Sequence, residues 1–212
     1  MPKVAILIYS VDDTIATLAE NEKKGIEIAG GKAEIFQVPD VSSSSSSDKE
    51  QDDDDDEGKV KKTNADFSYK ILTRETLVEH DYYLFGIPAK FGNFPVEWKT
   101  FWDSNTGGLW AKGSLHGKIA GLFVSGAISG KGDTEMCIMN AMSTLVHHGI
   151  IYVPLGYKNA YKELTDTDDV NGSCAWGAGC VSGVDGDRPP SVSELKVHQL
   201  QGRAFYERIR DL

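Results

Sequence analysis

The chain has 212 residues, of which 40% are hydrophobic, enough to bury the core of one domain. Its formal net charge is −10, but residues 48–57 (DKEQDDDDDE) hold eight acids and one lysine, so that the other 202 residues carry only −3. A body this close to neutral lacks the basic surface that binds nucleic acid, and the acidic run repels phosphate backbones. We therefore exclude a nucleic-acid partner.

Cysteine usage and the lengths of the apolar runs indicate a cytoplasmic protein. Cys137, Cys174 and Cys180 are too few for a disulfide framework or a zinc cage, and three thiols fit a reducing compartment. The first apolar run, residues 4–8, has five residues, which is too short for a signal peptide or a transmembrane helix. We expect no transmembrane segment and no metal site.

Strand and helix periodicities alternate along the first forty residues. Residues 3–9 (KVAILIY), which contain the apolar run 4–8, are typical of a buried strand, and residues 33–38 alternate as a second strand. The positions between them at helical spacing are Ile15, Leu18, Ala19, Glu22 and Ile26. Gly30 and Gly31 are expected to end this helix, because glycine adopts the left-handed conformation common at helix ends.

Residues 40–64 interrupt the alternation with six consecutive serines and five consecutive aspartates. A segment of this composition cannot bury apolar surface, so we expect a disordered, solvated insertion without a catalytic group. The run 52–56 does not resemble a calcium loop, which needs spaced ligands and a turn glycine.

The alternation resumes after the insertion. Strands are predicted at 82–87, 118–124 and 150–153, and helices at 73–79, 95–102, 135–146 and 191–209. A glycine-rich excursion occupies 154–190, and Ser191 with Glu194 forms a capping box for the last helix. This order predicts one α/β domain with a doubly wound, five-stranded parallel sheet of order 2-1-3-4-5, covered by helices on both faces in a three-layer α/β/α sandwich.

Loops that follow the carboxyl ends of such strands form the ligand site of a doubly wound sheet. Here they are 10–15 (SVDDTI), 88–94 (PAKFGNF) and 125–132 (SGAISGKG). Hydroxyls and backbone N–H groups of the first and third loops can hold a phosphate. Neither loop is a P-loop and no GxGxxG motif is present, so spacing alone identifies no ligand.

Five short motifs follow one another along the chain. They are FGIPAKFGN (85–93), TGGLW (106–110), TLVHHG (144–149), VPLGY (153–157) and GDRPPS (186–191). In this order they resemble the tryptophan-repressor-binding-protein-type NAD(P)H:quinone oxidoreductases, in particular the fungal flavodoxin-like members. The resemblance runs from Val4 to Ile209 outside the insertion, and it implies a flavodoxin-like fold.

The resemblance also implies FMN as cofactor, NADH or NADPH as co-substrate and a quinone as substrate. Because the flavin carries the hydride chemistry, no side chain is expected to be catalytic. The residues implied to hold FMN are Ser10, Val11, Asp12, Asp13, Thr14 and Ile15 at the phosphate, Ala89, Lys90, Phe91, Gly92 and Asn93 at the ring, Ser125, Gly126, Ala127, Ile128, Ser129 and Gly130 at its other edge, and His147 as a hydrogen-bond donor. Trp110 is implied to wall the quinone and nicotinamide pocket.

All three loops depart from the family pattern. Asp12 and Asp13 stand where an aromatic residue and a glycine are usual, and each carboxylate opposes a phosphate dianion by ~1 kcal/mol or more. The glycine's easy positive φ is lost as well. Ala89 and Lys90 replace a usual threonine and arginine, and lysine lacks the bidentate fork. The third loop is longer than usual. These departures predict weakened or lost FMN binding.

Several of these side chains also have an ordinary structural interpretation. His147 can be a histidine satisfied by backbone at a helix end, and His148 is expected to interact with the helix dipole. Trp98, Phe101 and Trp102 lie at helical spacing and are predicted core residues. Trp110 is expected in an exposed loop after that helix, which favours a ligand role.

Three functions stay open. The leading one is an FMN-dependent oxidoreductase that transfers two electrons from NAD(P)H to quinones. Its rival is a flavin-poor paralogue that acts as a binding or regulatory protein, peripherally associated with the plasma membrane. A one-electron flavodoxin shuttle is the weakest, because the long excursion and Trp110 suit a substrate pocket. The resemblance implies a homodimer or homotetramer, in which the excursion contributes to neighbouring sites.

Overall fold

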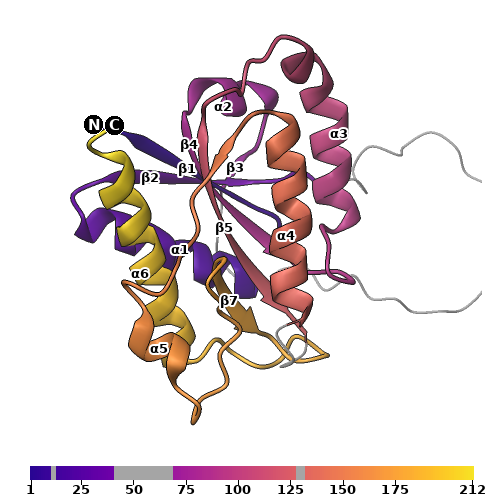
Figure 1. The fold of residues 1–212 in the computed structure, drawn as a ribbon. Coiled ribbons are helices and arrows are strands. Elements are labelled where there is room, and N and C mark those ends of the chain that lie inside the picture. The colour runs from indigo at the N-terminus through magenta and orange to yellow at the C-terminus, as the bar shows by residue number, and fades with distance from the viewer. Residues whose placement is uncertain (11–12, 41–68, 128–131) are drawn as a thin grey trace, which may run out of the picture.

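The computed structural model of the protein describes residues 1–10, 13–40, 69–127 and 132–212 (Figure 1). The predicted disordered insertion therefore lies almost wholly outside the described residues, as do Val11, Asp12 and the loop residues 128–130. In the described part, no helix is long and apolar enough to cross a membrane.

A parallel sheet forms the middle layer. Its strands are β1 (Lys3–Ile8), β2 (Lys32–Gln37), β3 (Lys70–Ile71), β4 (Tyr82–Pro88), β5 (Ile119–Gly126), β6 (Ile151–Tyr152) and β7 (Ala178–Val181). The order is β3-β2-β1-β4-β5-β6, and β7 also pairs with β5. The order 2-1-3-4-5 predicted from the sequence is confirmed, since β2, β1, β4 and β5 are its first four positions.

The strand count differs from the prediction at both edges. β3 adds two residues beside β2, pairing Lys70 with Phe36. On the other side, β6 pairs with β5 at Ile119 and Ala120, while β7 pairs with β5 from Phe123 to Gly126. The predicted strand at 150–153 is thus observed as β6, and β7 is an additional strand within the predicted excursion, because the glycine-rich chain leaves the sheet after β6 and returns as β7.

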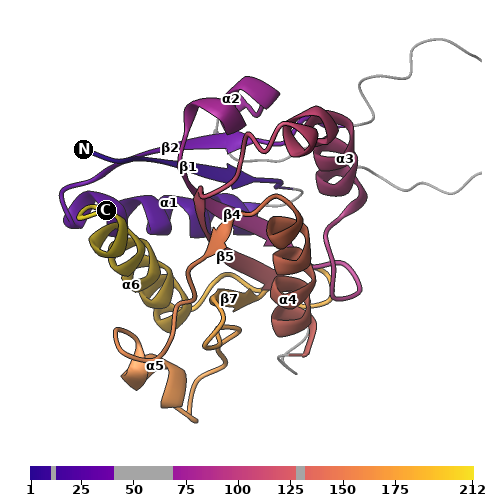
Figure 2. The ribbon, with the colours of Figure 1, turned by 45° about the horizontal axis from the view of Figure 1, so that its top comes forward.

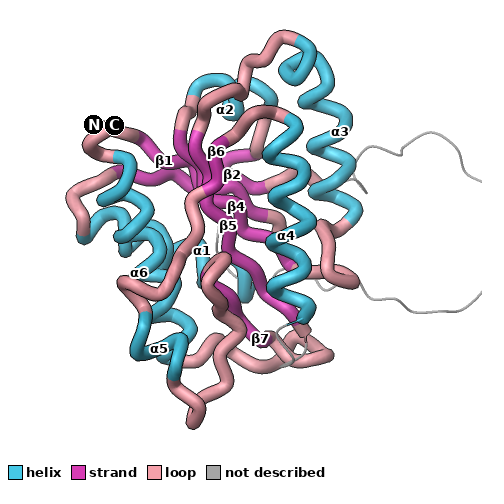
Figure 3. The backbone as a smooth tube through the Cα atoms, in the orientation of Figure 1, coloured by secondary structure: helices cyan, strands magenta, loops and turns pink. Residues whose placement is uncertain are grey.

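Helices cover both faces, as predicted. In Figures 1 and 3, α1 (Asp13–Ile28), α5 (Tyr161–Thr165) and α6 (Val192–Ile209) lie on one side of the strands. α2 (Arg74–Glu79), α3 (Val96–Ala111) and α4 (Gly132–His147) lie on the other. β1 shows why two cores form: Val4 and Ile6 pack with α1 and α6, whereas Ala5 and Leu7 face the opposite cluster. Alternate side chains of a strand point to opposite faces.

Two glycines let α1 and α6 approach closely. A Cβ atom on Gly25 would lie 2.1 Å from the carbonyl oxygen of Gln199, and one on Gly202 would lie 2.1 Å from that of Glu22. The backbones therefore touch at these positions, and any larger side chain would separate the helices. This contact holds the second half of α1 against α6.

α3 is longer than the sequence suggested. The predicted helix ended at Trp102, but α3 continues to Ala111, so Trp110 lies in its last turn rather than in a loop. Gly107 and Gly108 each disfavour a helix by about 1 kcal/mol. Burial of Leu109 at 3% exposure offsets that cost. The predicted core residues Trp98, Phe101 and Trp102 are buried, as expected.

Glu194 holds the excursion against the body. Its side chain is fully buried and accepts hydrogen bonds from the backbone N–H groups of Val181 at 2.9 Å and Ser191 at 2.8 Å. It also pairs with Arg188 at 2.8 Å. The bond from Ser191 N–H completes the predicted capping box, since the Glu194 N–H donates to the Ser191 hydroxyl in return. One carboxylate thereby joins α6, β7 and the end of the excursion.

Candidate flavin site

The described parts of the three predicted loops lie along one edge of the sheet. Ile8 is in register with Gly86, and Pro88 with Ser125, so β1, β4 and β5 end together. After β1 the chain enters α1 on one face, and after β4 it enters α3 on the other. Adjacent strands whose connections leave on opposite faces mark the switch point, where doubly wound sheets bind ligands.

The first loop leads directly into α1. Asp13 is the first helical residue, Thr14 is mostly buried, and Ile15 is a core residue at 1% exposure. Ile15 therefore packs inside the protein, and only its backbone remains for a ligand. Asp13 stabilises the helix N-terminus, which is also the place where the helix dipole would attract a phosphate.

Acidic groups extend beyond this first turn. The hydroxyl of Tyr9 hydrogen-bonds Glu97 in the first turn of α3, and Asp40 lies near enough to act on it. Burial, Glu97 and Asp40 together raise the pKa of Tyr9, so that the phenol stays neutral. Glu97 and Asp40 were not predicted as site residues, because neither lies in one of the three predicted loops.

The second loop is a tight turn. The Lys90 N–H donates to the Asn93 carbonyl at 2.9 Å, and the Asn93 N–H donates back at 3.0 Å. Phe91 and Gly92 have φ angles of 52° and 69°, which only glycine adopts without cost. The Phe91 side chain is fully exposed. A large ring held out by a constrained turn is positioned to contact a flat ligand.

Asp133 and Asn140 on α4 fix this turn from behind. The Gly92 N–H donates to Asp133 Oδ1 at 3.0 Å, and Asn140 Nδ2 donates to the Gly92 carbonyl at 2.7 Å. A Cβ atom on Gly126 would lie 3.0 Å from Asp133 Oδ2. The Asp133 carboxylate therefore lies where the second and third loops meet. Sequence reasoning missed both residues, because contacts across 41 and 48 positions leave no local pattern.

Ser125 and Gly126 belong to β5 rather than to a loop. Ser125 is buried, and its carbonyl accepts the N–H of Ala89 at 2.7 Å, which ties the second loop to the third. Ser182 donates through both its backbone N–H and its hydroxyl to the Gly126 carbonyl. The backbone at this edge is thus fixed before any ligand arrives.

Trp110 and His147 lie at the other end of their helices. Each lies at or next to the last residue of a 16-residue helix that begins at the flavin loops, and at 1.5 Å per residue that is about 22 Å away. Figure 2 shows α3 and α4 on the same face. Their carboxyl-terminal halves border a cavity of about 460 Å³ that Trp110 and His147 line together. Neither side chain therefore lies near the predicted flavin loops of its own chain.

His148 differs from its prediction. It is buried, and its ring meets Trp102 edge-on with centroids 5.2 Å apart. Burial, and the neighbouring His147, lower the pKa of His148, so the ring is neutral rather than a cation at the helix end. Trp110, by contrast, has the expected exposure, at 60%.

The fold resembles known flavodoxins. A WrbA-like flavodoxin from Agrobacterium tumefaciens has a TM-score of 0.65 at 16% identity, with 100% of this chain and 99% of that chain covered. An archaeal flavodoxin has a TM-score of 0.57 at 15% identity, with 98% and 99% covered. At such identities the likeness shows the fold alone, and that fold is flavodoxin-like, as the sequence predicted. No family model matches the chain.

Sequence relatives decide the family. The chain is 85% identical over 212 residues to Protein RFS1 of Saccharomyces cerevisiae, with 100% of both chains covered. It is 50% identical over 208 residues to NAD(P)H quinone oxidoreductase PST3 of Candida albicans, with 98% of each covered. The chain belongs to the fungal WrbA-type NAD(P)H:quinone oxidoreductase family. Two further Candida members of this family carry the same activity in their names.

The described residues provide a flavodoxin-type backbone edge, but the charges around it do not fit a phosphate. The positive-φ turn at Phe91, the fixed backbone at Ser125 and the N-terminus of α1 form a flavodoxin-type edge. Around them stand the carboxylates of Asp13, Asp40, Glu97 and Asp133, and the only described cation within the three loops is Lys90. A phosphate dianion placed at this edge would meet like charge.

Proposed function

We propose that the protein is an FMN-dependent oxidoreductase that transfers two electrons from NADH or NADPH to a quinone. The observation that carries this proposal is the convergence of the three loops at the switch point of a flavodoxin-like sheet, in a family whose members are named NAD(P)H quinone oxidoreductases. Bound flavin supplies the hydride chemistry. The chain then needs no catalytic side chain, only a site that holds the ring and excludes water.

Individual residues take distinct parts in this proposal. Ser10 and Thr14 offer hydroxyls to the phosphate at the start of α1. The turn at Lys90–Asn93, held by Asp133, positions its backbone and Phe91 beside the ring. Ser125 to Gly130 cover the opposite edge. Each assignment rests on the family resemblance together with the position of the loop.

Trp110 and His147 take part only from a second copy of the chain. Their distance from the loops of their own protomer is about 22 Å, so a homodimer or homotetramer has to bring them to a neighbour's flavin. The same faces of α3 and α4 expose Trp110, Met139 and Val146 at 60%, 37% and 67%. Exposed apolar side chains of this size favour an interface between protein chains.

The second candidate function is a flavin-poor binding or regulatory protein, located in the cytoplasm or peripherally at the plasma membrane. The observation that favours it is the acidic surround of the phosphate position, described above for Asp13, Asp40 and Glu97. Such a protein would keep the fold and the oligomer but not the cofactor.

Assays on the purified protein distinguish the oxidoreductase from the binding protein. We expect FMN fluorescence to be quenched on titration, and the loaded protein to oxidise NADH or NADPH over many turnovers only when a benzoquinone is present to reoxidise the flavin. The Trp110→Ala variant should lose most quinone turnover while it retains FMN, and size-exclusion chromatography with light scattering should show an oligomer. Failure to bind FMN at any concentration tested, with no quinone reduction, would exclude the enzyme and favour the binding protein. Equal loss of turnover and FMN in Trp110→Ala would make Trp110 structural.

A further inference from the structure

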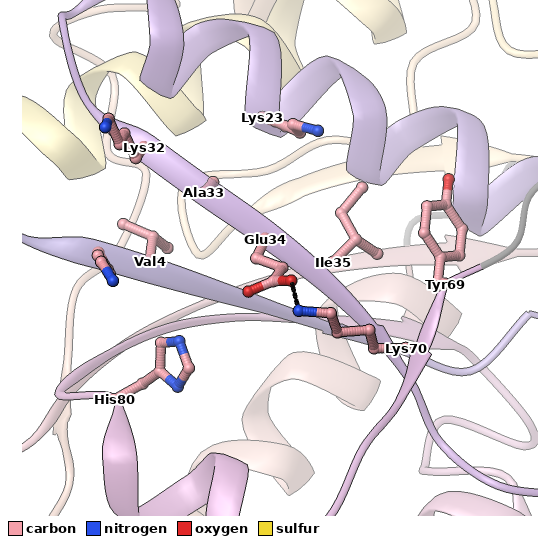
Figure 4. A pocket seen from close by; sticks show the side chains of 10 residues that line it. Val4, Lys23, Lys32, Ala33, Glu34, Ile35, Tyr69, Lys70 and His80 are labelled. Carbon is pink, nitrogen blue, oxygen red and sulfur yellow. Dashed lines mark ion pairs between the residues drawn. The ribbon is translucent and has the colours of Figure 1, made fainter.

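A second cavity lies at the opposite end of the sheet from the flavin loops. Its volume is about 500 Å³, and it is lined by the first residues of β1 and β2, by α1, and by the chain around β3 (Figure 4). β1 has six residues, so about 20 Å of strand separates this cavity from the first flavin loop. The two positions can therefore be occupied independently.

Lysines dominate the charge of this cavity. Lys3, Lys23, Lys32 and Lys70 line it, together with a single carboxylate, Glu34. Glu34 pairs with Lys70, as Figure 4 shows. We call the cavity lined by these four lysines the lysine pocket. The cavity carries a surplus of three positive charges in a chain whose net charge is −10.

Tyr69, His80 and the nearby Glu20 complete the surroundings of the lysines. Glu20, on α1, accepts a hydrogen bond from the hydroxyl of Tyr69 at 3.0 Å. Its side chain does not line the cavity. The other ring of the pocket, His80, contacts the Thr76 carbonyl through Nδ1 at 3.0 Å and stacks edge-on against Phe36. Tyr69 and His80 thus act as walls, and the ammonium groups remain the polar feature that a ligand would meet.

The register of the strands brings two of these lysines close together, which destabilises the protein when no ligand is bound. Lys3 and Lys32 are direct partners across β1 and β2, where neighbouring strands lie only about 4.8 Å apart. Like charges directly opposite one another destabilise a sheet. Beside them, β3 pairs with β2 in the described residues only at Phe36 and Gln37, which leaves the outer edge of residues 32–35 open there. An open strand edge offers backbone N–H donors.

We propose that the lysine pocket binds a small molecule that carries two or more phosphate groups. Ammonium groups bind phosphate as point charges, and a surplus of three charges is matched by a di- or triphosphate rather than by a single phosphate. The volume lies in the range of small-molecule sites. Two sources share this chemistry: a free oligophosphate and the head group of a phosphorylated inositol lipid.

Calorimetric titration of the full-length protein with tripolyphosphate tests the proposal. The double variant Lys3→Gln/Lys32→Gln should weaken binding at least about tenfold, and the affinity should fall as salt rises because screening weakens the attraction. Lys24→Gln is the matched control, since Lys24 is exposed on the same helix as Lys23 but does not line the cavity. It should change the affinity less than about twofold.

A gain-of-affinity variant guards against misfolding. Glu34→Gln removes the one carboxylate of the cavity, so it should tighten tripolyphosphate binding, an effect that damage to the fold cannot produce. Amide chemical shifts should move at Lys32, Ala33 and Lys70 and stay unchanged at Ser10. The proposal is overturned if no binding occurs, if Lys24→Gln weakens it as much as the double variant, or if the shifts centre on Ser10 and Thr14.

Vesicles identify the source of the phosphate. Phosphatidylcholine vesicles with and without phosphatidylinositol bisphosphate are compared in sedimentation assays. Binding that needs the inositol lipid and is competed by tripolyphosphate supports the head group, whereas binding of tripolyphosphate without vesicle binding supports a free oligophosphate. Vesicle binding that Lys3→Gln/Lys32→Gln leaves intact, with no tripolyphosphate binding, would also overturn the proposal.

Discussion

The two ends of the sheet are lined by side chains of opposite charge. The acidic end is the one where a phosphate cofactor would require positive charge. At the carboxyl end, where flavodoxin-like sheets bind their ligand, Asp13, Glu97 and Asp133 lie in the first turns of α1, α3 and α4. At the amino end, the four lysines of the lysine pocket line a cavity with a single carboxylate. The carboxyl end therefore combines a flavodoxin-type backbone with acidic side chains.

This difference separates what a fold provides from what side chains provide. Strand order and helix direction place three helix N-termini at one edge, and their dipoles favour an anion there. An acidic residue in each first turn stabilises the helix, but it also neutralises the positive end of the helix dipole that would attract a phosphate. The stability of the scaffold and its affinity for phosphate are therefore opposed at this edge, and the scaffold can persist after phosphate affinity declines.

The largest effect is expected at Glu22, on the helix that joins the two ends. Its side chain is fully buried, and in the described structure neither carboxyl oxygen has a hydrogen-bond partner. Burial raises the pKa of Glu22 well above its usual value, so the folded state holds a proton that the unfolded state releases once the pH exceeds its ordinary pKa. Folding stability should then fall as pH rises, by about 1.4 kcal/mol per pH unit.

Glu22→Gln should abolish this pH dependence. Urea unfolding at several pH values from 5.5 upward compares the slopes of the free energy of unfolding, so that any constant cost of the buried amide cancels. Parallel slopes for the two proteins would mean that Glu22 does not hold a proton in the folded state.

The next effect concerns the first loop. Asp12→Tyr with Asp13→Gly removes two negative charges beside the phosphate and restores a residue that tolerates positive φ. FMN should bind at least about tenfold more tightly, which corresponds to 1.4 kcal/mol, and the gain should shrink at high salt. Fluorescence quenching measures both constants. Asp12→Asn with Asp13→Asn separates charge from conformation. Equal affinities in parent and variants would show that this loop does not determine FMN binding.

A smaller effect is expected at Asp133, whose two functions can be separated. Asp133→Asn keeps an oxygen that can accept the Gly92 N–H but removes the charge, so FMN should bind about threefold more tightly. Asp133→Ala removes the charge and the tether together, and it should lose part of that gain because the turn is no longer fixed. Should alanine and asparagine give the same affinity, the tether would have no part in positioning the loop.

Those parts of the fold that depend on local sequence patterns could be predicted. Those parts of the site that form by contact between distant residues could not. Apolar runs in the sequence predicted β1, β4 and β5, and the capping-box pair Ser191 and Glu194 predicted the start of α6. Gly107 and Gly108 obscured the end of α3, since tertiary burial of Leu109 outweighs their low helix propensity. Asp133 reaches Gly92 only through the fold. The TGGLW motif also gives the residue type at Trp110 but not its position in the last turn of α3, away from the loops.

The central claim, that charge rather than shape limits cofactor binding at the carboxyl end, is tested most directly by comparing FMN with riboflavin, which is the same flavin without its phosphate. Both are titrated into the full-length apo-protein under identical low-salt conditions. If like charge cancels the attraction of the α1 N-terminus, the two affinities should agree within about threefold. Binding of FMN about a hundredfold or more tighter than riboflavin would contradict the account, because the phosphate would then be attracted to this edge.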